Sequence, residues 1–156
     1  MAQRILIAMD DSENAFRSVE LVAKSFSADN TVVLYNVLLD TAALCNMESP
    51  ELIPLFKSQQ TSFCALEDKK RELVTAAMKR AKELLVSAGF SEKKVEIKVE
   101  NKNKGVARDI LAEAENGYDI IVMGRRGISG LKEFFLGSIS QKVFTGARDI
   151  SVLIAN

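Results

Sequence analysis

The sequence contains no histidine. Its absence excludes Ser-His and Cys-His nucleophile pairs, histidine-ligated zinc and imidazole general-base catalysis. Only two cysteines are present, Cys45 and Cys64, and they lack the C-x-x-C spacing of redox and metal motifs. In an intracellular protein such cysteines are more often reduced packing residues than a disulfide, and we predict reduced packing residues here.

The sequence also has no net charge, because 21 Lys and Arg residues are balanced by 21 Asp and Glu residues. Without a positive field to hold a polyanion, DNA and RNA are not expected partners. No apolar run approaches the roughly 18 residues of a membrane helix, and the first residues turn acidic at Asp10, too early for a signal peptide. We therefore expect a cytoplasmic protein with no membrane partner.

With 156 residues, of which 47% are hydrophobic, the chain suits one globular domain over residues 1–156. Apolar segments bounded by turn residues predict five strands, at Arg4–Met9, Thr31–Val37, Lys94–Val99, Ile120–Met123 and Ile150–Ala155. Helical patterns lie between them, and strand–helix–strand units of this kind predict right-handed parallel crossovers. The fold class is therefore α/β, a doubly wound parallel sheet with helices on both faces.

One helix is well marked and the segment before it is not. Residues Leu38 to Glu67 mix polar and apolar types and predict a loop with a short helix, either a lid or partner surface or padding over the sheet edge. A long helix follows up to Ala88 and ends at Gly89. Its charged residues are interpreted as a solvated face, and its buried stripe is predicted to be Leu66, Leu73, Ala77, Ala81, Leu84 and Leu85.

The sequence has neither a P-loop nor a G-x-G-x-x-G after the first strand, so a nucleotide would need another cradle. Residues Tyr118 to Ser140 offer one. A fully apolar strand ends at Gly124, further glycines follow, and Gly137-Ser138 begins a short helix. Closely approaching backbone N–H groups and a helix N-terminus can both bind anions. An alternative is that the glycines only shape a turn while Ser138 and Gln141 form a capping box.

Asp10 is the carboxylate expected at the carboxyl end of the first strand, beside this glycine loop. It is either a cap for the following helix or a ligand-binding group, and Asp11 or Ser12 could serve equally well as the cap.

The segment GRRGISGLKEFFLGSIS, with its G-x-x-G, nine residues and G-S, resembles the nucleotide-binding signature of the universal stress protein family, specifically its ATP-binding branch. The resemblance extends from RILIAMDDSE near the start to SVLIAN at the end. Val106 and Ser151 stand where the family often has proline. The resemblance implies strand order 3-2-1-4-5, which would bring Asp10 and Gly124 together where the chain reverses direction.

The resemblance also implies ATP as the ligand, with Mg²⁺ or Mn²⁺ held by the phosphates and no direct metal ligand from the protein. Asp10 would face the ribose, and backbone groups near Ala8, Met9 and Val37 would hold adenine. The full set of expected nucleotide-binding residues is Ala8, Met9, Asp10, Val37, Met123, Gly124, Arg126, Gly127, Gly137, Ser138, Ile139 and Ser140.

The leading hypothesis is an ATP-binding stress-response protein that acts as a nucleotide-dependent switch or chaperone-like factor. A slow ATP-hydrolysing enzyme is less favoured because no convincing base accompanies the cations. A module that binds no nucleotide is disfavoured by the glycine pattern. A homodimer through Ile150–Ala155 is expected, because this edge strand carries no charge, proline or obvious bulge to protect it.

Overall fold

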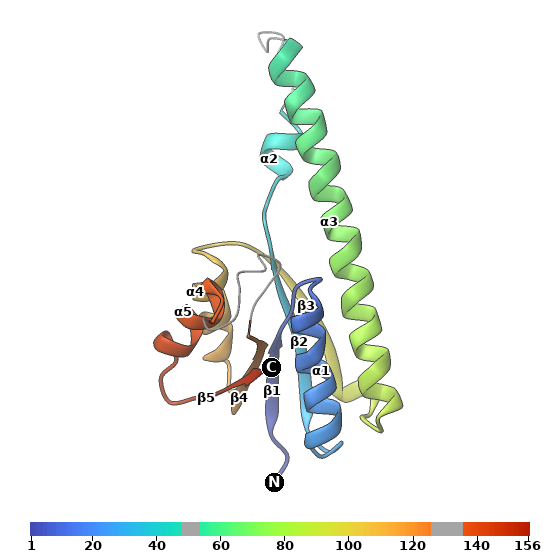
Figure 1. The fold of residues 1–156 in the computed structure, drawn as a ribbon, viewed down its shortest axis with the longest axis vertical. Coiled ribbons are helices and arrows are strands. Elements are labelled where there is room, and N and C mark those ends of the chain that lie inside the picture. Colours follow the sequence, from blue (N-terminus) through green and yellow to red (C-terminus); the bar gives the residue numbers. More distant parts are fainter. Residues whose placement is uncertain (48–53, 126–135) are drawn as a thin grey trace.

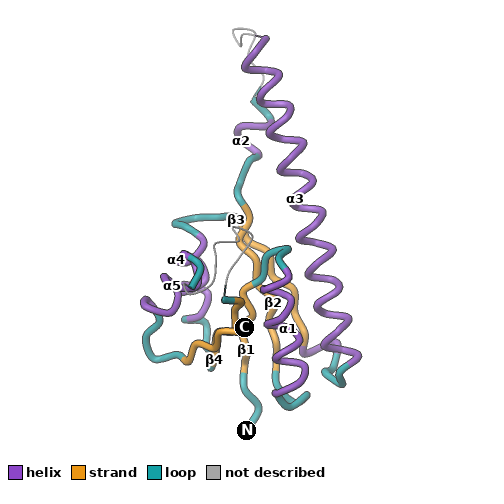
Figure 2. Tube along the Cα trace, viewed as in Figure 1, coloured by secondary structure: helices purple, strands orange, loops and turns teal. Residues whose placement is uncertain are grey.

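The computed structural model describes residues 1–47, 54–125 and 136–156. Five parallel strands form one sheet in the order β3-β2-β1-β4-β5, which confirms the predicted α/β fold and strand order. Figures 1 and 2 show the sheet with helices on both sides. The strands are β1 Arg4–Ala8, β2 Thr31–Leu38, β3 Val95–Asn101, β4 Ile120–Gly124 and β5 Ser151–Ala155. The helices are α1 Glu13–Ser25, α2 Ala42–Cys45, α3 Pro54–Ser87, the 3-10 turn η1 Glu92–Lys94, α4 Val106–Ala114 and α5 Ser138–Gly146.

Side-chain alternation along the strands divides the core into two layers. Ile5, Ile7 and Leu34 face α1 and α3, whereas Leu6 and Val33 face α4 and α5. Because β1 and β4 are central and covered on both faces, they need the unbroken apolar runs that the sequence shows. Each fully buried aliphatic side chain of this kind contributes about 1.5–3 kcal/mol.

Helix α1 begins at a capped turn and lies against the end of β4. Ser12 is its N-cap and accepts a hydrogen bond from the Ala15 amide at 3.1 Å. The first turn of α1 comes so close to Gly124 that a Cβ there would lie 2.6 Å from the Asn14 carbonyl oxygen. Glycine is therefore required at position 124 by helix packing, a role that its position in the glycine motif did not reveal.

Helix α3 is longer than predicted. It begins at Pro54, inside the segment expected to be mainly loop, and proline is well suited to a first helical turn. We call residues 54–73 the α3 arm and residues 74–87 the α3 base. In Figure 1 the arm extends well beyond the sheet. The helix ends before Gly89, whose φ of 105° is the left-handed conformation expected of a C-terminal glycine.

The predicted buried stripe of α3 is partly wrong. The residues buried against the sheet are Val74, Met78, Ala81 and Leu85. Leu66 and Leu73 are 67% and 47% exposed. Apolar residues occupy two neighbouring faces of this helix. The two faces are offset by one residue along the sequence, which is a rotation of about 100° around the helix axis, so periodicity alone does not decide which face packs.

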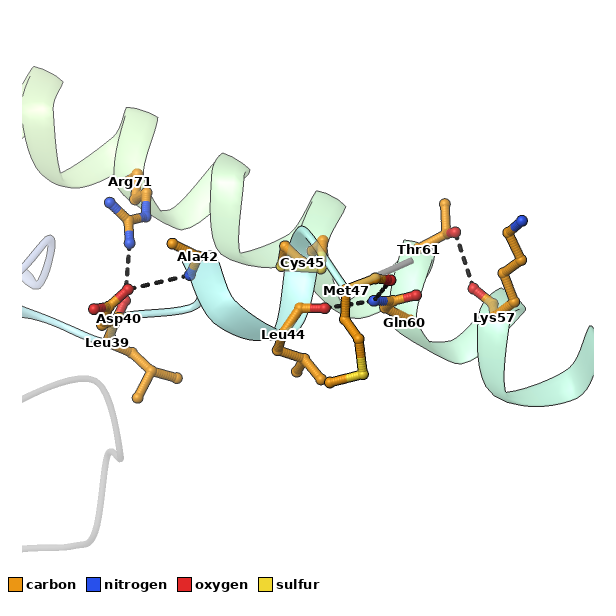
Figure 3. Close-up of a disulfide and its surroundings, with 11 residues drawn as sticks. Leu39, Asp40, Ala42, Leu44, Cys45, Met47, Lys57, Gln60, Thr61 and Arg71 are labelled. Carbon is orange, nitrogen blue, oxygen red and sulfur yellow. Dashed lines mark hydrogen bonds between the residues drawn. A yellow bond between two sulfur atoms is a disulfide. The ribbon is translucent and has the colours of Figure 1, made fainter. Parts of the chain in front are cut away.

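Cys45 and Cys64 form a disulfide, so the prediction of two reduced cysteines is wrong. The bond joins α2 to the α3 arm, and Figure 3 shows the short α2 lying along the arm. Gln60 strengthens this contact by donating from Nε2 to the carbonyl oxygens of Leu44 and Met47. The cysteines meet because α3 starts early enough to run back past α2, and no local pattern encodes that return.

The two sheet edges differ. At one edge, β3 is exposed beyond Val95 except at the half-buried Lys98, and Ile97 and Val99 are 43% and 42% exposed. The predicted edge position is confirmed, but apolar as well as charged residues reach solvent. At the other edge lies β5, as predicted, and α3 packs over β2 and β3 instead of covering it.

In the described ranges, no helix combines the length and apolar content needed to cross a bilayer.

Candidate functional site

A pocket opens at the carboxyl ends of β1, β2 and β4, where the connections from the central strand reverse direction. Its volume is about 390 Å³, within the range of small-molecule sites. Open α/β sheets bind ligands at such switch points. Two of the predicted residues, Arg126 and Gly127, lie outside the described residues. All the others line this one pocket: Ala8, Met9, Asp10, Val37, Met123, Gly124, Gly137, Ser138, Ile139 and Ser140.

Asp10 is half-buried at the turn between β1 and α1. Its Oδ1 accepts a hydrogen bond from the Ser12 amide at 2.8 Å. Since Ser12 is the residue that caps α1, the alternative role of Asp10 as that cap is wrong. Asp10 instead orders the turn and brings its carboxylate to the pocket wall.

The start of α5 forms another part of the pocket wall. Gly137 is its N-cap, with a φ of −58°, and Ser138 is already the first helical residue. The alternative interpretation of Ser138 and Gln141 as a capping box is therefore wrong, and the N-cap residue supplies no side-chain hydrogen bond to this helix end. The first-turn amides of α5 provide donors and the positive end of a helix dipole at the pocket.

Ser140 holds this wall in place. Its side chain is buried, and its hydroxyl donates to the Gly124 carbonyl at 2.8 Å. The Gly137 amide donates to the Arg125 carbonyl at 2.8 Å. These bonds fix the start of α5 against the end of β4. The Ser140 proton is used internally, so a direct bond from it to a phosphate would require a change in this contact.

Helix α3 supplies part of the pocket that the sequence reading missed. Glu67, Lys70, Arg71 and Val74 line it from the lower arm and the top of the base. The guanidinium of Arg71 donates to the Leu39 carbonyl at 2.9 Å and so ties the β2–α2 connection to the helix. The four α3 residues that line the pocket are spaced i, i+3, i+4 and i+7, which places them on one face of the helix. This spacing was available in the sequence, but the charged residues of the helix were interpreted as a solvated surface.

Asn36 and Asp11 also line the pocket and were not predicted. The Asn36 amide nitrogen donates to the Met9 carbonyl at 2.6 Å. Among described residues, the Oδ1 atoms of Asp11 and Asn36 are buried without a hydrogen-bond partner. A polar residue within the apolar strand TVVLYNVL was the available signal.

The adjacent Tyr35 is a fixed neutral donor. Its hydroxyl donates to Glu100 at 2.9 Å. Burial, together with this bond to a carboxylate, raises the pKa of Tyr35 well above its ordinary value. The pocket wall at Tyr35 is therefore uncharged at physiological pH.

This fold and this pocket define a doubly wound α/β protein with a ligand crevice at the switch point. The profile of the universal stress protein family matches residues 1–155, and the chain belongs to that family. A curated relative, universal stress protein YxiE of Bacillus subtilis (strain 168), is 50% identical over 54 residues, which are 34% of this chain and 36% of the relative. The match thus spans about a third of that relative's length.

Solved structures share the fold over nearly the whole chain. The protein MJ0577 is 28% identical, with a TM-score of 0.68 and coverage of 99% of this chain and 96% of the other. A universal stress protein family protein from Arabidopsis thaliana with AMP bound is 15% identical, with a TM-score of 0.62 and coverage of 99% and 92%. At that identity the second likeness shows the fold alone.

Proposed function

We propose that this chain is an ATP-binding universal stress protein, a cytoplasmic nucleotide-dependent switch or chaperone-like factor in which residues 1–156 act as one nucleotide-binding domain. The observation that carries the proposal is the convergence of Asp10, Val37 and Gly124 with the start of α5 on one pocket. Neither a turn nor a helix cap requires that convergence. The Arabidopsis relative with AMP bound supports the ligand class.

The arrangement suggests how a nucleotide would lie. The base would occupy the β1 and β2 ends near Ala8, Met9 and Val37, and Asp10 would meet the ribose. The phosphates would lie at the N-terminus of α5, near Gly137 and Ser138, where amide donors and the helix dipole favour negative charge. Arg126 and Gly127, outside the described residues, are expected to extend this cradle. Mg²⁺ or Mn²⁺ would be held by the phosphate oxygens and would neutralise their charge.

Binding is tested by asking whether purified protein releases ATP on denaturation, and by calorimetry with added ATP. Gly137→Val should abolish binding because a branched side chain would fill the phosphate position. The φ of −58° at Gly137 is acceptable to valine, so the fold should survive. Thr145→Val introduces the same side chain into an exposed position of α5 and should bind ATP normally. Unchanged affinity in a folded Gly137→Val variant would contradict the phosphate position.

The proposed switch hydrolyses ATP slowly or only with a partner, because phosphoryl transfer needs an oriented nucleophile as well as cations. Steady-state turnover without a partner is the measurement. A rate near the enzyme median of about 10 per second would favour the enzyme hypothesis instead.

The proposed functional unit is a homodimer through β5. This strand is an edge of the sheet, and Val152, Leu153 and Ile154 are only partly buried. An antiparallel copy about a two-fold axis would pair the open backbone groups and cover these side chains. Light scattering that gives a monomer at tens of micromolar, with and without ATP, would refute the dimer.

A further inference from the structure

The Cys45–Cys64 disulfide joins two elements that take no part in the hydrophobic core. Neither α2 nor any described residue of the α3 arm is buried. Both cysteines are half-buried, so a small thiol can approach the bond from solvent. The core is formed by the strands, the other helices and the α3 base. Opening the disulfide should therefore leave the sheet and the base folded.

The two segments that the disulfide joins also form part of the pocket wall. Leu38 and Leu39, at the end of β2 and directly after it, line the pocket from one segment. Glu67, Lys70 and Arg71 line it from the α3 arm. Arg71 donates to the Leu39 carbonyl at 2.9 Å, so the two segments are bonded to each other at the pocket itself. The shape of this wall depends on how the β2–α2 connection lies against the helix.

The disulfide and the Arg71 bond close a ring between these two segments, as Figure 3 shows. Along α3, Cys64 precedes Arg71 by two helical turns, or about 10 Å. The covalent bond at one end of the ring limits the movement of the polar contact at the other end. Once the disulfide is open, this end of the wall is held by polar bonds such as that of Arg71, which contribute about 1 kcal/mol each.

We propose that the Cys45–Cys64 bond is a thiol-exchange site, through which a dithiol reductant lowers the affinity of the pocket for its nucleotide. The proposal rests on the proposed nucleotide binding in the cytoplasm and adds a regulation of that site. Disulfides in a reducing compartment are usually transient or redox-sensing. The oxidised protein holds the two pocket segments in place before the ligand arrives. The reduced protein must order them during binding, and that ordering lowers the affinity.

The exchange passes through a mixed disulfide and transfers two electrons. A thiolate of the dithiol attacks the sulfur of one cysteine, and the other cysteine leaves as a thiolate. The second thiol of the dithiol then attacks the mixed disulfide and releases the first cysteine. The dithiol is thereby oxidised to a disulfide, and its two protons end on Cys45 and Cys64. An oxidised dithiol closes the bond again by the reverse steps.

Calorimetry with ATP tests the proposal on the oxidised protein and on the protein kept reduced with dithiothreitol. We expect the reduced protein to bind ATP about tenfold more weakly, which lies within the usual range of coupling between two sites. The Cys45→Ser, Cys64→Ser double variant is the control. It should bind ATP like the reduced protein, with or without dithiothreitol. Hydrogen exchange over residues 74–87 should stay slow in every form, which would show that the base remains folded.

The coupling must also act in the reverse direction. ATP that saturates both forms should make the disulfide about tenfold harder to reduce, which lowers its reduction potential by about 30 mV. Equilibration with mixtures of reduced and oxidised dithiothreitol measures this shift, with free thiols counted by alkylation and mass spectrometry. In the Gly137→Val variant, which is expected not to bind ATP, added ATP should cause no shift.

Equal ATP affinity of the oxidised and reduced proteins would overturn the proposal, while nucleotide binding itself would stand. The disulfide would then have only a structural role in the arm. The proposal would also fail if dithiothreitol did not open the bond in the folded protein, or if reduction made exchange fast over the whole α3 base. A protein that binds ATP in neither form would overturn the proposed function and this proposal together.

Discussion

The base and the arm of α3 belong to one continuous helix but are stabilised by different means. The base buries Val74, Met78, Ala81 and Leu85 against the sheet. No described residue of the arm is buried, and its connections to the rest of the chain include a disulfide and a few polar bonds. Since most helix stability in proteins comes from packing of an apolar face, the base should be much harder to unfold than the arm.

The comparison matters for function because the pocket spans both parts. Val74 lines it from the base, whereas Glu67, Lys70 and Arg71 line it from the lower arm. A ligand would thus contact a firmly packed wall on one side and a weakly held helix on the other. Binding is expected to order the arm as well as to fill the pocket.

The largest expected effect is in the base. Leu85→Ala should destabilise the protein by about 2–5 kcal/mol, because Leu85 is fully buried and a cavity would remain. Leu66→Ala is the same change in the arm, at a residue that is 67% exposed, and should cost less than about 0.5 kcal/mol. Urea unfolding measures both. Similar losses for the two variants would show that the arm packs as tightly as the base.

The next effect concerns the disulfide. Reduction should release the constraint on the 19-residue separation between Cys45 and Cys64, for which chain entropy gives about 3 kcal/mol. We expect the loss to be local, because the buried residues of α3 all lie in the base and none lies in the described arm. Hydrogen exchange should accelerate over residues 54–66 and remain slow over residues 74–87.

The control for reduction is the Cys45→Ser, Cys64→Ser double variant, in which the reducing agent should change nothing further. If reduction accelerated exchange in the base as strongly as in the arm, the two parts would unfold as one unit and the comparison would fail.

A smaller effect is expected at the joint between arm and pocket. Arg71→Ala removes the bond to the Leu39 carbonyl and should cost about 1 kcal/mol, while loosening the β2–α2 connection. Lys69→Ala is the control. It removes an exposed i, i+3 pair with Glu72, whose net contribution is expected to be about 0–0.5 kcal/mol. Thermal unfolding and ATP affinity should separate the two variants.

The smallest expected effect on stability at neutral pH comes from two carboxylates of α4, those of Asp109 and Glu113. Their pH dependence allows α4 to be compared with the α3 base. The Asp109 carboxylate accepts bonds from the Lys104 amide at 3.0 Å and the Asn103 amide at 2.8 Å. The bond from Lys104, opposed by burial and aided by Asn103, holds the pKa of Asp109 below its usual value. Burial by itself raises the pKa of Glu113, but bonds from Lys98 and Tyr118 outweigh it and lower that pKa.

Both carboxylates have lower pKa values in the folded state than in the unfolded state. They therefore stabilise the protein at any pH above their unfolded pKa values, which are about 4. That contribution is lost as the pH falls through the folded values. Acid should therefore loosen α4 before it affects the α3 base, whose buried contacts are apolar. Hydrogen exchange at decreasing pH measures this order. Asp109→Asn should reduce the pH dependence, and Glu115→Gln, at an exposed carboxylate beside α4, should leave it unchanged.

Much of the fold and of the candidate site could be predicted from the sequence. The unbroken apolar run before Gly124 is typical of a central parallel strand, and β4 is one. Gly89 ends α3 as expected. The predicted site residues within the described ranges line one pocket because they lie at the ends of strands, directly after a strand or at the start of α5, and parallel strands bring such positions to the same edge.

Other features were decided only by the tertiary structure. The helix face that packs in α3, the Cys45–Cys64 bond and the need for glycine at position 124 all depend on which distant backbone segments come together. The burial of Asn36 Oδ1 without a hydrogen-bond partner among the described residues likewise depends on what surrounds it. The sequence by itself determined the strands, their burial and the end of the sheet that carries the pocket, because these follow from local periodicity and turn residues. Which residues far apart along the chain come into contact is decided by three-dimensional packing. A local sequence pattern holds no information about such contacts.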